Sequence, residues 1–81
     1  MKESKMAYYT ATQEFPPSIN NGESALLVVD AGTGTVSLEV KAGANWIVQE
    51  LFDADAVKRV YTGGGTWRCV VTGDAAFEWA D

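Results

Sequence analysis

The chain has 81 residues, with 11 acidic and 6 basic side chains and a formal net charge of −5. This length fits a single domain. An acidic protein is repelled by phosphate backbones and by anionic membrane surfaces, so we expect no nucleic acid and no membrane as a partner. Cys69 is the only cysteine and there is no histidine, which excludes a disulfide within the chain and argues against a zinc site.

The sequence shows no catalytic constellation, and we expect no enzymatic activity, no metal and no cofactor. Asp53 and Asp55 are closely spaced carboxylates, but the further oxygen ligands of a calcium loop are missing, so we interpret them as turn residues. Cys69 has no histidine to serve as its base, and we expect a buried, inert thiol. A free cysteine fits synthesis in a reducing cytoplasm. The first residues are not followed by an apolar segment, so we expect no secretion signal.

Residues 1–22 are predicted to form an extended arm ahead of a compact body at residues 23–81. The pattern of residues 6–12 permits a short strand, and the adjacent prolines that follow break regular structure. The arm carries large rings without an obvious core, and aromatic residues are enriched where proteins meet. We therefore predict that the arm binds a partner through Tyr8, Tyr9, Phe15, Pro16 and Pro17.

The first half of the body predicts three strands. Residues 24–30 form a continuous apolar run of strand length, which suggests burial on both faces. Residues 35–41 alternate, with the aliphatic positions facing inward and the polar ones, Glu39 among them, facing water. Residues 44–52 return after a tight turn, and their broken phase indicates a bulge or an apolar outer face. Ile47 and Leu51 on that face are the alternative partner-binding residues.

Residues 57–72 predict a central hairpin. Two runs rich in β-branched and aromatic residues flank three consecutive glycines, which reach positive φ without steric cost. Trp67 and Cys69 then face the core. Arg59 and Arg68 would lie on adjacent strands and pair with Glu50 or Asp74.

A short last strand with Phe77 and Trp79 in phase completes the pattern. The sequence as a whole predicts an all-β fold, a small antiparallel β-sandwich or meander of about six strands with an extended N-terminal arm.

Three segments carry a resemblance to a known type of domain: residues 34–41, the acidic linker leading into residues 57–60, and the glycine-rich stretch at residues 62–73. Together they resemble a small β domain of tailed-bacteriophage virion proteins, found in capsid decoration or cement proteins and related accessory proteins. The resemblance spans residues 24–79. It implies an assembly role on the virion surface, no enzyme activity, and a homo-oligomeric arrangement that is often trimeric.

The expected function is thus that of a phage structural protein that binds the major capsid protein or another virion protein, after synthesis in the host cytoplasm. A tail or head-fibre assembly component is a close variant. The alternative from another class is a carbohydrate- or receptor-binding module on the virion surface. Its sugar platform would use Tyr8, Tyr9, Trp46 and Trp79, although tryptophans in phase with valines usually belong to a core.

Overall fold

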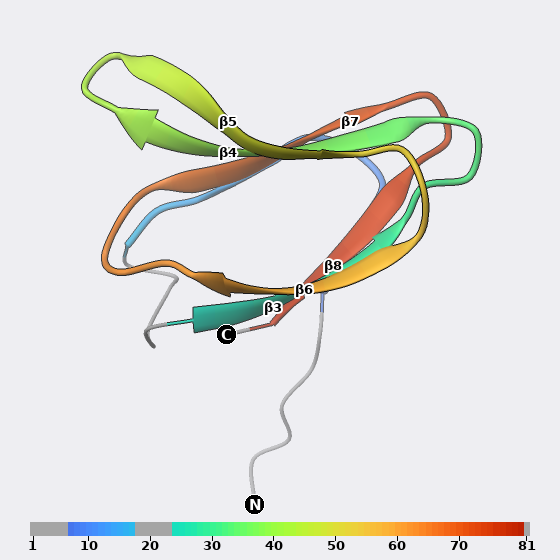
Figure 1. Cartoon of the computed structure of the whole chain (residues 1–81), viewed down its shortest axis with the longest axis horizontal. Coiled ribbons are helices and arrows are strands. Elements are labelled where there is room, and N and C mark those ends of the chain that lie inside the picture. The colour runs from blue at the N-terminus through green and yellow to red at the C-terminus, as the bar shows by residue number, and fades with distance from the viewer. Residues whose placement is uncertain (1–6, 18–23, 81) are drawn as a thin grey trace, which may run out of the picture.

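The computed structural model describes residues 7–17 and 24–80, and all regular structure in these ranges is β-strand. The fold is all-β and consists of two antiparallel four-stranded sheets (Figure 1). There are eight strands in the described residues where the sequence predicted about six. They are β1 (Ala7–Tyr9), β2 (Gln13–Phe15), β3 (Ser24–Asp30), β4 (Thr35–Ala42), β5 (Asn45–Phe52), β6 (Ala56–Tyr61), β7 (Trp67–Thr72) and β8 (Ala76–Ala80).

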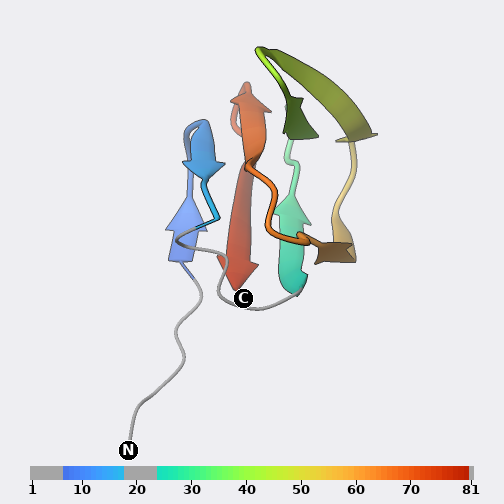
Figure 2. The same cartoon turned by 90° about the vertical axis from the view of Figure 1, so that its left-hand side faces the viewer.

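The two sheets lie face to face as a sandwich. The first sheet has the strand order β1-β8-β3-β6 and the second has the order β2-β7-β4-β5. Figure 1 shows the second sheet above and the first below, and Figure 2 shows the same layers from the side. Among the described strands only β4 and β5 are consecutive and paired, because every other connection carries the chain from one sheet to the other. The sandwich alternative is therefore confirmed and the meander is wrong.

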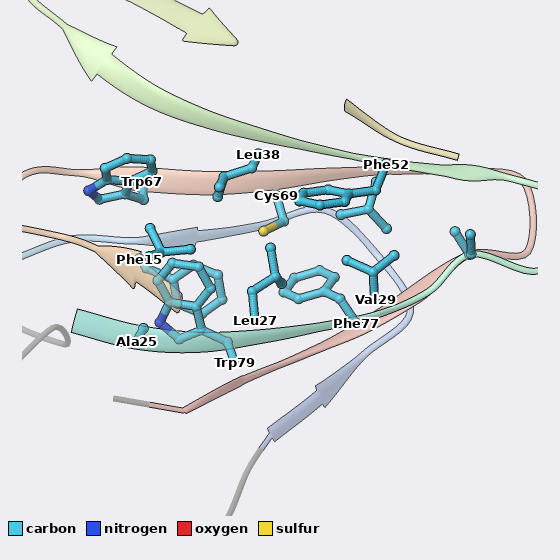
Figure 3. Packing of buried hydrophobic residues seen from close by; sticks show 14 residues of the cluster. Phe15, Ala25, Leu27, Val29, Leu38, Phe52, Trp67, Cys69, Phe77 and Trp79 are labelled. Atoms are coloured by element: carbon cyan, nitrogen blue, oxygen red, sulfur yellow. The ribbon is translucent and has the colours of Figure 1, made fainter. Parts of the chain in front are cut away.

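The core fills the space between the sheets, as the alternation of apolar residues along the strands requires. In β3 the buried positions are Ala25, Leu27 and Val29, while the residues between them are half-buried, so only one face of this strand is fully covered. Val36 and Leu38 of β4 face them from the second sheet and are fully buried. Figure 3 shows side chains of the two sheets meeting in this layer, Leu38 and Cys69 from the second sheet and Leu27 and Phe77 from the first.

The predicted central hairpin is wrong, because β6 belongs to the first sheet and β7 to the second. Both strands carry a buried inner face, Val60 on β6 and Trp67 on β7. Buried inner faces are compatible with strands side by side in one sheet and with strands on opposite sides of the core, so the packing of the other strands decides between the two arrangements. The loop between them is closed by two bonds to the carbonyl of Thr62, one from the backbone of Gly65 (2.8 Å) and one from the Trp67 indole N–H (3.1 Å).

The described part of the predicted arm, residues 7–17, also differs from the expectation. Instead of standing apart from the body, it forms β1, which pairs with β8, and β2, which pairs with β7. The physical reason lies in the rings, because Phe15 stacks on Trp79 at 4.4 Å between centroids and Tyr9 stacks on Phe77 at 5.1 Å. The predicted strand at residues 6–12 thus corresponds only to β1, and the remaining arm residues, 1–6 and 18–22, lie outside the described ranges.

The predicted bulge in the third strand of the body is confirmed. Leu38 of β4 lies opposite Glu50, whereas the next residue, Glu39, lies opposite Val48, so Gln49 is the extra residue of β5. A bulge shifts the phase of all residues beyond it. Leu51 therefore shares a face with Trp46 and Val48, while Ile47 is on the opposite face, in contrast to the predicted grouping of Ile47 with Leu51.

Candidate interaction surfaces

Large apolar side chains are exposed on two parts of the sandwich. Val48 (57%) and Leu51 (60%) lie on the outer face of β5, and Ile47 (50%) lies on its inner face. Tyr8 (56%), Val57 (69%) and Tyr61 (76%) lie on β1 and β6 of the first sheet. Within residues 7–17 and 24–80 there is no pocket, and no group of three potential ligands that could hold a metal ion.

The first surface, which we name the β5 patch, consists of Trp46, Val48 and Leu51. Their partners on β4 are Lys41, Glu39 and Ser37, all on the outer face of the second sheet, and directly opposite residues in a sheet share a face. The patch lies along the edge of this sheet, because β5 is its last strand. It is an apolar strip beside polar neighbours, a composition typical of the centre of protein interfaces.

An ion pair fixes the aromatic residue of the β5 patch. The Arg68 guanidinium contacts Glu39 at 2.6 Å and 2.7 Å through two of its nitrogens, and it lies over the Trp46 ring at 4.3 Å from the centroid. The Ser37 hydroxyl donates a further bond to the other oxygen of the Glu39 carboxylate at 2.9 Å. Glu39 is only 8% exposed, so the prediction that it faces water is wrong. The network holds the indole in place without leaving a charge unpaired.

The prediction that Arg59 and Arg68 lie on adjacent strands is also wrong. Arg59 lies on β6 in the first sheet and Arg68 on β7 in the second. Glu50, named as a partner, instead pairs with Lys58 at 3.0 Å and links the edge strands of the two sheets. Both side chains of that pair are more than one third exposed, so its contribution to stability is small.

The second surface, which we name the first-sheet face, consists of Tyr8, Val28, Val57 and Tyr61. One cross-strand row runs from Tyr8 of β1 through Glu78 of β8 and Val28 of β3 to Val57 of β6. Tyr61 lies on the same side of β6 as Val57, since residues four positions apart on a strand point to the same face. This face is on the opposite side of the molecule from the β5 patch.

The residues predicted to bind a partner through the arm have different environments. Tyr8 and Pro17 are exposed, whereas Tyr9 and Pro16 are half-buried. Phe15 is 2% exposed and belongs to the core, so its assignment as a partner-binding residue is wrong. The sugar platform is not assembled either, because Trp79 is 5% exposed between the sheets while Trp46 lies under Arg68 on the far side of the second sheet.

Acidic side chains collect in the loops at one end of the sandwich. Asp55 accepts a bond from the backbone N–H of Ala31 at 3.0 Å, and Asp74 accepts bonds from the N–H and the hydroxyl of Thr33 at 2.8 Å and 2.9 Å. The bonds from Thr33 lower the pKa of Asp74 below its ordinary value. Asp30 is the last residue of β3 at the same end, and Asp53 lies in the same loop as Asp55. Asp55 and Asp74 thus tie neighbouring loops together. Asp53 and Asp55 both lie in the connection between β5 and β6, in agreement with their interpretation as turn residues.

The remaining charges of the described residues balance. Outside the acidic end, the anions are Glu14, Glu39, Glu50 and Glu78, and the cations are Lys41, Lys58, Arg59 and Arg68. Both outer faces of the sandwich are therefore close to neutral, and the excess negative charge belongs to the loop end.

The burial of Cys69 is confirmed. The side chain is fully buried, and burial, assisted by the negative charge of Glu39, raises the pKa of its thiol to about 12. Among the described residues no helix is long and apolar enough to cross a membrane.

Comparison of the chain with models of protein families, with curated proteins and with solved structures finds no match.

Proposed function

We propose that this chain is a non-enzymatic structural protein of a tailed-phage particle, a capsid decoration or cement protein that binds the major capsid protein and stabilises the particle. The observation that carries the proposal is the exposure of large apolar side chains over the nearly neutral first-sheet face, where Val57 and Tyr61 are 69% and 76% exposed. Large apolar side chains exposed on one face of a small soluble protein are typical of a site of protein contact.

The all-β sandwich agrees with the fold that the resemblance to phage virion domains implies. The glycines within the resembling segments also have a structural role. A Cβ on Gly34 would lie 1.9 Å from the carbonyl oxygen of Thr72, and Gly73 adopts a φ of 62° beside it. These two residues let the loops of the acidic end touch, so both glycines have a structural role in the segments on which the resemblance is based.

The first-sheet face is assigned to the capsid because its chemistry suits a broad contact. Tyr8 and Tyr61 supply large rings with a polar tip, Val28 and Val57 supply an aliphatic centre, and Glu78 and Arg59 provide one charge of each sign. Tyrosine at the margin of an apolar centre is a common anchor at protein interfaces. Tyr8, the exposed ring of β1, is thereby kept as a partner-binding residue.

Co-sedimentation with particles that lack this protein tests the proposal. Wild-type protein should pellet with purified heads, and Tyr8→Glu and Val57→Glu should each weaken that binding about tenfold or more, because a charge would be placed in an apolar contact. Ala54→Glu, which adds the same charge in an exposed loop of the acidic end, is the matched control and should bind like the wild type. Binding to purified tails but not to heads would overturn the decoration assignment.

A further inference from the structure

The four edges of the sandwich differ in how they are protected. β1 and β2, the edges on one side, are three residues long, and short edge strands offer little backbone to another chain. β6 carries Lys58 and Arg59 at its centre, and such charges oppose strand addition. β5 is eight residues long and has no charged side chain from Asn45 to Gln49. A bulge can itself shield an edge, but by its length and its uncharged stretch β5 is the edge of the described sandwich best suited to receive a further strand.

The bulge makes this edge self-complementary. In a regular strand, two residues an odd number of positions apart point to opposite faces. Trp46 and Leu51 are five positions apart and would point to opposite faces of a regular strand. The extra residue Gln49 between them shifts the alternation by one, so both face outward. For the same reason Ile47 and Glu50 both face inward. If two copies of β5 run antiparallel about a two-fold axis between Val48 and Gln49, Trp46 and Ile47 each lie opposite a residue on their own face, Leu51 and Glu50 of the partner subunit.

The pairs formed in this register are favourable ones. Trp46 lies opposite Leu51 of the partner subunit, an aromatic–aliphatic pair of the kind that stabilises sheets. Glu50 lies opposite Ile47 of the partner subunit, so the two glutamates do not face each other. Registers centred on Val48 or on Gln49 themselves would place outward residues such as Trp46 opposite inward ones, which the core side of the sheet does not allow.

The charge distribution favours the same arrangement. The unbalanced negative charge lies at the loop end of the sandwich, next to the last residue of β5. An antiparallel two-fold pair places the two acidic ends at opposite ends of the joined sheets, where like charges are screened from each other. The β5 patch, which meets its own copy, carries no net charge because Glu39 and Arg68 neutralise each other.

We propose that β5 pairs with β5 of a second copy in this antiparallel register, joining two second sheets into one continuous sheet of eight strands. The contact is isologous and closes as a dimer. The backbone groups of the edge strand gain partners, and the β5 patches of both copies form one apolar strip across the dimer. The proposal specifies the oligomer and the surface that makes it, and it stands independently of which particle the protein binds.

Sedimentation velocity of the purified chain over a wide range of concentration is the first test. The wild type should reach the mass of two chains. Val48→Glu should raise the dissociation constant about tenfold or more, because it places two like charges beside the two-fold axis. Val57→Glu is the matched control, since Val57 is similarly exposed on the other sheet and should leave the dimer unchanged. Wild-type protein that stays monomeric throughout, or equal effects of both substitutions, would overturn the proposal.

Disulfide cross-linking tests the register. Across the proposed axis the two Gln49 residues are diagonal neighbours, at about 6 Å between Cα atoms from the strand spacing and rise, within the range that a disulfide spans. The Gln49→Cys variant should therefore form covalent dimers under mild oxidation. Asn45→Cys is the control on the same strand, because its two copies would be roughly 23 Å apart. Cross-linking of Asn45→Cys, or of neither variant, would refute this register.

The two experiments separate this inference from the proposed function. A Val57→Glu protein that dimerises but no longer pellets with heads supports both the β5 dimer and the capsid contact of the first-sheet face. Failure of the wild type to bind heads while it dimerises overturns only the capsid assignment, and binding by a strictly monomeric wild type overturns only the dimer.

Discussion

Substitution of Phe15 best tests whether residues 7–17 are part of the sandwich, as observed, or form an arm that is independent of it. The side chain is 2% exposed and stacks on Trp79 at 4.4 Å with an interplanar angle of 7°, with Tyr9 at 5.5 Å and Phe77 at 6.1 Å. Truncation of a buried phenylalanine to alanine costs about 3–5 kcal/mol. The whole chain, at about 0.05–0.15 kcal/mol per residue, has a stability of roughly 4–12 kcal/mol.

Phe15→Ala should therefore remove a large part of the stability and lower the melting temperature by about 12–40 °C, at about 4–8 °C per kcal/mol for a domain of this size. Thermal unfolding followed by far-ultraviolet circular dichroism measures the shift. Pro17→Ala, an exposed substitution two residues further along, is the control and should melt close to the wild type. A Phe15→Ala midpoint within about 5 °C of the wild type would show that residues 7–17 contribute little to the core and would refute the reasoning.

Three further predictions concern charged and titratable groups. The Cys69 thiol, whose pKa is about 12, should react far more slowly with a thiol reagent in native buffer at pH 8 than in denaturant, and equal rates would contradict its burial. The folded pKa of Asp74 is lowered, so its contribution to stability is present above its ordinary pKa of 3.8 and is lost as the pH falls through the folded value. Asp74→Ala should accordingly melt below the wild type at pH 7, with a difference that shrinks under acid, and a difference independent of pH would count against the bonds from Thr33. Arg68→Met should cost about 1–3 kcal/mol in urea unfolding because it leaves the Glu39 carboxylate nearly buried and short of donors, and the double substitution Arg68→Met with Glu39→Met should recover most of that loss.

Local patterns predicted the candidate surfaces only in part. The alternation of residues 44–52 predicted that Ile47 and Leu51 are exposed apolar residues, and the break in that alternation indicated the bulge. The bulge position decides which side chains share a face, and it depends on pairing with β4, which alternation within β5 does not reveal. The pairing of Arg68 with Glu39 also joins residues 29 positions apart, and no local signal distinguishes it from the alternatives Glu50 and Asp74.

The sequence by itself determined the strands of the body, the inward positions of Val36, Leu38, Cys69 and Trp79, and the tight turns at glycine. These features follow from alternation and from backbone sterics, which act within a few residues. Only the tertiary structure decided which strands are neighbours. Two amphipathic strands joined by a short loop can pair at their edges or cover each other across a core, and both arrangements bury the same faces of the same residues. The choice between them for residues 57–72, and the inclusion of Phe15 in the core, depend on the packing of all eight strands together.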